Sequence, residues 1–170
     1  MTISQFVFAP EEPAHDAEIE EINAEAFGPG RFTRAAQRIR EGGPHDRGLS
    51  FVALSGTNVI ASVRQTPVKA GEGRALLLGP LAVRPAWKNI GIGRRLMAMA
   101  LDAAKKTGWP AVVLVGDEPY YGPLGFNRMP RGQISLPGPV DPNRVLAHEI
   151  EPGAVARLTG MLDHEERAKG

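Results

Sequence analysis

Two glycines at the start of a helical stretch give the clearest sign of chemistry in the sequence. Gly91 and Gly93 follow Lys88 and are followed at once by Arg94 and Arg95. The N-terminus of a helix already carries partial positive charge, so each arginine there costs a few tenths of a kcal/mol, up to about 1, unless an anion binds against it. Free backbone N–H groups at such an end bind phosphate. The pattern therefore predicts a phosphate-binding turn.

Spacing separates this turn from two other phosphate-binding motifs. A Walker loop needs a glycine, four residues and then Gly-Lys-Ser or Gly-Lys-Thr, and the sequence has no such run. A dinucleotide-binding fingerprint needs a third small residue after Gly91 and Gly93, where this chain has Leu96. A lone Gly-x-Gly also occurs in ordinary strand-to-helix turns. What remains is a basic residue, two others and then Gly-x-Gly at the start of a helix.

The segment around this turn resembles the acetyl-CoA pyrophosphate loop of the GCN5-related N-acetyltransferases. In that family the loop is Gln/Arg-x-x-Gly-x-Gly/Ala and follows a strand that ends in Val-x-Pro. Here the strand ends in Val83-Arg84-Pro85, and the loop reads Lys88-Asn89-Ile90-Gly91-Ile92-Gly93. Lys88 replaces the usual Gln or Arg but keeps a positive side chain.

A second motif of the same family follows in the expected order. Tyr121, Gly125 and Phe126 match Tyr-x-x-x-Gly-Phe, which in the family closes the helix after the fifth strand. The Gly-Asp-x-x-Tyr-Tyr form of this motif and the later GPVDPNRVLAHEIEPGA stretch are similar to a bacterial subgroup of predicted acetyltransferases. The resemblance extends over residues 75–126 and is weaker on either side.

The resemblance implies an acetyl-CoA-dependent N-acetyltransferase that moves the acetyl group directly to a primary amine. It implies that acetyl-CoA binds to Leu81, Ala82, Val83, Lys88, Asn89, Ile90, Gly91, Ile92, Gly93, Arg94 and Tyr121. Pro80 cannot donate a ladder hydrogen bond, so we expect a bulge there or a neighbouring strand that has separated. The N–H of Leu81, beside Pro80, is the expected donor to the oxyanion.

Tyr121 is the residue that the resemblance places near the CoA sulfur. We assign it the role of proton donor to the departing thiolate. The alternative is that its ring packs against the cofactor while its hydroxyl meets water. We expect the neighbouring Tyr120 to be structural.

The general base is the least defined part of the expected site. A protonated amine has no lone pair, so a base or a water chain must remove its proton. Asp117 and Glu118 are our candidates, because they follow an apolar strand where the sheet is expected to separate. Three other carboxylates lie in segments where acceptors bind in the family, although each alone is more often a solvated surface charge: Glu21, Glu25 and Glu72.

Composition excludes several kinds of site. The chain has 170 residues, a net charge of +1 and no cysteine, which excludes a disulfide framework, a cysteine nucleophile and a Cys-ligated metal. The four histidines lack metal-like spacing, so we expect no metal: His15, His45, His148 and His164. Near-zero net charge and the absence of a long apolar run or a signal pattern predict no nucleic-acid partner, no membrane and a cytoplasmic location.

We expect one domain over residues 1–170, because this length and 42% apolar content match one hydrophobic core. We expect a monomer or homodimer. Strands are predicted over 3–9, 50–55, 59–67, 76–83, 111–115, 133–136 and 145–150, and helices over 14–27, 33–40, 91–107 and 155–162. One face of the third helix should be buried: Ile92, Leu96, Met99, Ala100 and Ala103.

This order of elements matches the family and implies an α/β (α+β) fold. The central sheet of that fold is mixed, mostly antiparallel, splayed between strands 4 and 5 and flanked by helices. An acyl-CoA-binding or sensor module without a catalytic base is the alternative function, and a nucleotide-phosphate binder is a third. The acceptor, a small-molecule or peptide amine, has no shared motif, although Arg31 and Arg34 either contact an anionic acceptor or remain in solvent.

Overall fold

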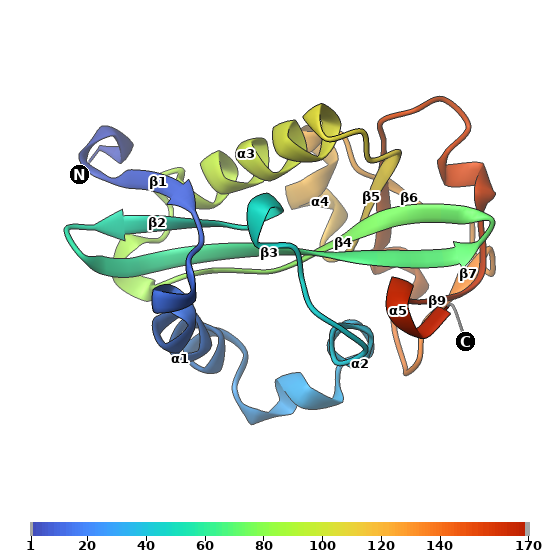
Figure 1. The fold of residues 1–170 in the computed structure, drawn as a ribbon, viewed down its shortest axis with the longest axis horizontal. Coiled ribbons are helices and arrows are strands. Elements are labelled where there is room, and N and C mark those ends of the chain that lie inside the picture. Colours follow the sequence, from blue (N-terminus) through green and yellow to red (C-terminus); the bar gives the residue numbers. More distant parts are fainter. Residues whose placement is uncertain (1, 169–170) are drawn as a thin grey trace.

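A mixed sheet carries the segments singled out by the sequence (Figure 1). The computed structural model describes residues 2–168, and its sheet runs in the order β1-β2-β3-β4-β5-β8-β6. The strands are β1 (Val7–Pro10), β2 (Phe51–Ser55), β3 (Asn58–Gly71), β4 (Gly73–Val83), β5 (Ala111–Val115), β6 (Asn127–Arg128), β7 (Ile134–Ser135), β8 (Val145–Glu149) and β9 (Leu158–His164). Pairing is antiparallel along this order except between β4 and β5, which are parallel.

Helices cover both faces of the sheet (Figure 1). The helix α3 (Ile92–Lys106) lies along one face, and α1 (Asp16–Phe27) and α2 (Ala35–Arg40) lie along the other. Two short helices complete the set, α4 (Glu118–Tyr121) and α5 (Glu165–Ala168). Short 3-10 turns occupy Ile3–Gln5, Pro13–His15, Pro29–Thr33, Arg47–Leu49, Pro85–Trp87, Gly122–Leu124, Pro142–Arg144 and Val155–Arg157. No helix within residues 2–168 has the length and hydrophobicity of a membrane span.

Strand alternation explains why β4 reads as a continuous apolar run. Leu76 and Leu78 pack in the core under α3, whereas Leu77 packs with Ile39 of α2 on the opposite face. A strand covered on both faces needs apolar residues at successive positions. The residue after Leu78 therefore faces α2, and this residue is Gly79.

The buried face of α3 is rotated slightly from the predicted one. Ile92, Leu96 and Ala100 are fully buried as expected, but Met97 and Ala104 complete the buried set. Met99 and Ala103 are half-buried at its edge. The helix begins after Gly91, whose φ of +99° suits a glycine, and ends before Gly108, whose φ is +83°.

The prediction of a C-terminal helix over 155–162 is wrong. A 3-10 turn ends at Arg157, and residues 158–164 form β9, which pairs with β3 and β7. Leu158 and Leu162 are both buried, and a spacing of four suits a helix as well as a strand. The extension of β3 to Gly71, beyond the predicted end at Pro67, supplies the partner that decides for a strand.

The N-terminal strand is also shorter than predicted. Ile3–Gln5 form a 3-10 turn, and strand pairing begins at Val7 opposite Leu54. The strands expected over 133–136 and 145–150 shrink to β7 and β8, while the hairpin turn after Ser55 and the turn between β3 and β4 are confirmed.

Candidate active site

A cleft opens where β4 and β5 separate. The two strands pair at Leu76 with Val112 and at Leu77 with Val113, and no pairing follows toward their C-terminal ends. Beyond that point a cleft of about 1110 Å³ is lined on one side by residues 78–83 and on the other by residues 114–117. The expected separation of strands 4 and 5 is therefore confirmed.

The wall of β4 is irregular at the position predicted from Pro80. The register between β3 and β4 shifts between Val63 and Gln65, which pair with Leu81 and Leu78 respectively. Both expected alternatives occur together, because β4 is bulged on its β3 side and unpaired on its β5 side. Leu81, the predicted oxyanion donor, lines the cleft directly after the bulge.

One end of the cleft is formed by the N-terminus of α3. Gly91 is the N-cap, and no side chain caps the first N–H groups of the helix. Asn89 has a φ of +64°, a conformation that Asn tolerates better than most residues. A Cβ on Gly93 would lie 3.0 Å from the Tyr120 hydroxyl oxygen, so the glycine keeps this end narrow but unobstructed.

The predicted cofactor-binding residues gather at this end, with one exception. Those that line the cleft are Leu81, Ala82, Val83, Lys88, Asn89, Gly91, Ile92, Gly93, Arg94 and Tyr121. Ile90 instead packs its side chain against the core under α3. Lys88 and Arg94 form no ion pair within the described chain, whereas Arg95 lies 5.6 Å from the centre of the Phe8 ring. Uncapped N–H groups beside two unpaired cations fit a diphosphate.

Tyr121 is held in the cleft by close ring packing. A Cβ on Gly116 would lie 2.4 Å from Cε2 of Tyr121, so the ring occupies the space that a side chain there would need. The ring also meets Phe126 edge to face at 6.0 Å. Burial, with smaller contributions from Tyr120 and Asp117, raises the pKa of Tyr121 to about 12. The hydroxyl therefore keeps its proton at neutral pH and can donate it.

Asp117 and Glu118 are adjacent in the sequence, but their side chains form ion pairs with different arginines. Asp117 lines the cleft and forms an ion pair with Arg144 at 3.2 Å. Glu118 lies in a neighbouring depression and pairs with Arg128 at 3.0 Å. Of the two candidate bases, Asp117 is thus the one that faces the cleft.

The other carboxylates considered from sequence lie away from the cleft lining. Glu21 and Glu25 approach Arg84 at 3.5 and 3.9 Å, and Glu72 is exposed in the turn between β3 and β4. Within residues 2–168 no three His, Asp or Glu side chains gather as a metal site would require.

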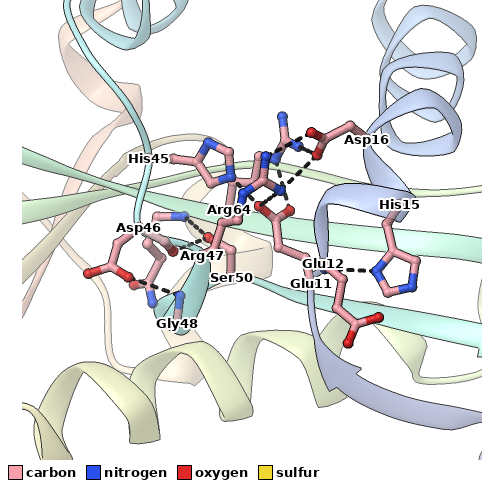
Figure 2. Close-up of polar contacts among 11 residues, drawn as sticks. Glu11, Glu12, His15, Asp16, His45, Asp46, Arg47, Gly48, Ser50 and Arg64 are labelled. Atoms are coloured by element: carbon pink, nitrogen blue, oxygen red, sulfur yellow. Dashed lines mark hydrogen bonds and ion pairs between the residues drawn. The ribbon is translucent and has the colours of Figure 1, made fainter.

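Two charged features of the cleft were missed by sequence reasoning. The first is a buried cluster around Glu11, whose side chain is 0% exposed (Figure 2). Its carboxylate meets the His45 ring nitrogen Nε2, and Nε of Arg64 at 3.0 Å. Arg64 and Arg47 also bind Asp16, at 3.1 and 2.7 Å. His45 and Arg64 line the cleft, so this cluster forms part of its wall.

Glu11 is charged because its partners outweigh its burial. Burial alone would raise the pKa of the Glu11 carboxyl, but hydrogen bonds from His45 and Arg64 and the charge of Arg64 hold that pKa below its usual value. The pKa of Asp16 is also lowered, first by its hydrogen bond with Arg47.

The second missed feature is Arg40, the last residue of α2. Arg40 lines the cleft together with Arg31 and Arg34, the two arginines that the sequence did single out. Arg31 pairs with Glu20 at 2.7 Å, and Arg34 lies 5.1 Å from the centre of the Phe27 ring. The Nε of Arg40 is buried without a hydrogen-bond partner in the described chain. No motif marks this residue, because its surroundings come from Gly79 of β4, which is distant in the sequence.

The chain is similar to known acetyltransferases. The model of the acetyltransferase (GNAT) family matches residues 16–126. The chain is 27% identical to the uncharacterized N-acetyltransferase YhbS of Escherichia coli over 89 residues, which are 52% of this chain and 53% of YhbS. It is 26% identical to the uncharacterized N-acetyltransferase YjhQ of E. coli over 130 residues, 74% of this chain and 72% of YjhQ. The chain thus spans about half the length of YhbS in that match.

Solved structures share the fold. The crystal structure of E. coli YhbS in complex with CoA has a TM-score of 0.78 at 23% identity, covering 98% of this chain and 93% of that one. A GNAT family acetyltransferase from Brucella melitensis in complex with acetyl-CoA has a TM-score of 0.60 at 26% identity, covering 85% and 96%. The mixed sheet with parallel β4 and β5 is therefore the fold of these proteins. Because the family model covers more than half of its length, this chain belongs to the acetyltransferase (GNAT) family.

Proposed function

We propose that this protein is an N-acetyltransferase that moves an acetyl group from acetyl-CoA directly to a primary amine. The observation that carries the proposal is one continuous cleft, which joins the uncapped start of α3 to the protonated hydroxyl of Tyr121. A phosphate site at one end and a proton donor further in are what transfer from a CoA thioester requires. The CoA and acetyl-CoA complexes of the two structural relatives support the same choice of cosubstrate.

Residues of the α3 end would hold the diphosphate of the cosubstrate. The N–H groups of Ile92, Gly93 and Arg94 are the donors, and the side chains of Lys88 and Arg94 add positive charge. Tyr120, expected to be structural, places its hydroxyl next to Gly93 and is a further candidate for this contact. The unpaired edge of β4 from Leu81 to Val83 offers backbone groups to the amide-containing arm.

The reacting groups would meet at the bulge of β4. Acetyl-CoA supplies an acetyl group activated as a thioester. The N–H of Leu81 would donate to the acetyl oxygen as negative charge develops on it. Tyr121 would give its proton to the departing sulfur, and its high pKa keeps this proton in place throughout the neutral range.

Asp117 is the better placed of the two candidate bases. It would accept the proton of the ammonium group, directly or through water, because it lines the cleft next to Tyr121. Glu118 could reach the cleft only after leaving Arg128. Both carboxylates are engaged in ion pairs, which is the observation that favours the alternative of an acyl-CoA-binding module without catalysis.

A Gly91→Val variant tests the diphosphate site. Apart from its two chain neighbours, the described atom nearest to a Cβ at Gly91 is Cγ2 of Ile3 at 4.0 Å, so a side chain there obstructs a ligand rather than the protein. Gly108→Val is the matched control, since Gly108 also has a positive φ and has open space around its Cβ position at the other end of α3. We expect calorimetry to show loss of acetyl-CoA binding in the first variant alone. Equal binding by both variants would show that the diphosphate lies elsewhere.

A Tyr121→Phe variant tests the chemistry at the same cleft. The ring and its packing remain while the acid is lost, so the chemical step should slow by about 10²–10⁴-fold with nearly unchanged acetyl-CoA affinity. The measurement is single-turnover release of free thiol with a panel of amines. An unchanged rate would remove Tyr121 from the mechanism and point to water as the donor. Thiol release that no amine accelerates would favour the binding-module alternative.

A further inference from the structure

The cations of the cleft fall into paired and unpaired groups. Arg31, Arg64 and Arg144 each bind a carboxylate, on Glu20, Glu11 and Asp117 respectively. Within the described residues, the other cleft-lining cations form no ion pair: Lys88, Arg94, Arg34 and Arg40. The first two lie at the α3 end, where the diphosphate site is proposed. The second two lie on the opposite face of the sheet, at the two ends of α2 (Figure 1).

Arg40 extends from α2 to the bulge of β4. Its Nη2 atom lies 2.6 Å from the position that a Cβ on Gly79 would occupy. Gly79 has a φ of +129°, so both its conformation and its missing side chain make room for the guanidinium. Pro80 and Leu81 come next in β4, which brings the charge of Arg40 beside the proposed place of acetyl transfer.

The guanidinium of Arg40 is half-buried, and its buried Nε lacks a partner within the described chain. Burial, together with a smaller effect of the charge of Arg34, lowers the pKa of Arg40 to about 10. Arg40 therefore stays protonated at neutral pH while its buried Nε donates to no acceptor in the described chain. Buried charges in proteins are normally paired or hydrogen-bonded, because an unpaired one is strongly destabilising.

The remaining acids of the cleft do not meet this need. Glu20 and Asp117 are held by other arginines, and the Asp141 carboxylate accepts from the N–H of Asn143 at 2.9 Å. The diphosphate site is too far away, since β4 advances about 13 Å between Gly79 and Val83, before the chain turns toward α3. Among the groups considered, the second substrate is the remaining source of an anionic partner.

We propose that the acceptor is a primary amine that also carries an anionic group, a carboxylate or a phosphate, and that Arg40 binds this group. This inference rests on the proposed function and adds the class of its acceptor. The planar guanidinium offers paired donors to either oxyanion, and Arg34 adds positive charge on the same side. A fixed anion at Gly79 would hold the amine beside the acetyl group at Leu81.

Matched amines test the acceptor class. β-Alanine is compared with propylamine, lysine with 1,5-diaminopentane, and phosphoethanolamine with ethanolamine, with thiol release from acetyl-CoA as the readout. We expect the anionic member of at least one pair to have a kcat/KM higher by about 10- to 100-fold, the worth of one charge-assisted hydrogen bond. The pair that shows the difference tells carboxylate from phosphate. Equal turnover of the two members of every pair, with and without the anionic group, would overturn the proposal.

Variants of α2 assign the preference to Arg40. Arg40→Met should abolish the preference while leaving acetyl-CoA affinity unchanged, and Arg40→Lys should restore part of it. Arg38→Met is the matched control, because Arg38 is exposed on the same helix and outside the cleft, where it donates to the Pro137 carbonyl. A preference that survives in Arg40→Met would contradict the assignment.

Direct binding separates this proposal from the proposed function. CoA-saturated protein is titrated by calorimetry with the three amines that carry an anionic group and with their counterparts that lack it. Binding of an anionic amine by the parent and by Arg38→Met, with loss in Arg40→Met, supports the anion site even if no amine is acetylated, in which case the proposed function fails alone. Absence of any Arg40-dependent binding overturns the anion site even if some neutral amine is acetylated.

Discussion

Arg64 and Arg40 line the same cleft, but within the described residues only Arg64 is paired with carboxylates. Arg64 is held by two carboxylates, at 3.0 Å from Glu11 and 3.1 Å from Asp16 (Figure 2). Arg40 has a buried nitrogen and no carboxylate partner in the described residues. The fold thus pairs one arginine of the cleft with two carboxylates and leaves another without a carboxylate partner in the described residues.

From this difference we expect Arg64 to have a structural role and Arg40 a functional one. A buried ion cluster becomes destabilising when one member is removed, because the others lose their compensation. The Arg40 side chain is half-buried and its buried Nε has no partner in the described chain, so its removal should not harm folding. Stability measurements therefore distinguish the two arginines without knowledge of the substrate.

The largest effect is expected from Glu11→Gln. This change leaves Arg64 and Arg47 with Asp16 as their only carboxylate, and breaking a buried ion pair in this way costs about 3–5 kcal/mol. The free energy of unfolding in urea is the measurement. Glu72→Gln is the control, because Glu72 is exposed in a turn and its loss should change stability by less than about 0.5 kcal/mol. Similar stabilities of the two variants would show that the cluster is not a structural unit.

The same comparison of unfolding free energies at acidic pH is a second test of the Glu11 cluster. The pKa of Glu11 in the folded protein lies below its usual value of 4.5, so its contribution is fully present above pH 4.5 and is lost as pH falls through the folded-state pKa. The difference in unfolding free energy between parent and Glu11→Gln should therefore narrow in that acidic range. A constant difference would mean that the variant acts through packing rather than charge.

Arg40→Met should change stability in the opposite direction. Methionine keeps the length of the buried stem while removing a donor that has no partner, so the free protein should gain about 1–3 kcal/mol. Arg64→Met is the matched comparison and should lose stability, because it leaves Glu11 buried with a weaker set of partners. Urea unfolding without substrate measures both. A marked loss of stability in Arg40→Met would identify Arg40 as structural and remove the basis of the contrast.

Sequence reasoning predicted the α3 end of the cleft because that end depends on local chemistry. Gly91 and Gly93 are needed by a helix start, and the charges of Lys88 and Arg94 follow within a few residues. The separation of β4 from β5 was signalled by Pro80, since a proline has no N–H to donate to a ladder. Features set by neighbours in sequence are visible in the sequence.

The part of the cleft lined by His45, Arg64 and Arg40 could not be predicted, because its properties arise from contacts between distant segments. Glu11 and Glu12 are adjacent, and nothing local reveals that Glu11 is buried against Arg64 while Glu12 is exposed. Arg40 lies beside Gly79 of β4, and a 3-10 turn and the strands β2 and β3 separate these two residues in the sequence. The strand β9 was mistaken for a helix for the same reason, since its partner is the extended end of β3.

The smallest effect is expected from an ion pair on the surface, which sets the scale for the buried ones. Asp102 and Lys106 are one turn apart on α3 at 2.9 Å, with side chains 58% and 74% exposed. Water and salt screen such a pair, so Asp102→Asn should lower the free energy of unfolding by about 0.3–0.5 kcal/mol, and the loss should vanish in about 1 M salt. Thermal or urea unfolding at two salt concentrations provides the measurement. If this change destabilised the protein as much as Glu11→Gln, burial would not be what gives the Glu11 cluster its value, and the contrast between Arg64 and Arg40 would lose its physical reason. We expect Asp102→Asn to lower the free energy of unfolding about ten times less than Glu11→Gln. That result would show that an ion pair contributes to stability in this fold mainly where it is buried. The missing carboxylate partner of Arg40 would then favour a ligand at this residue.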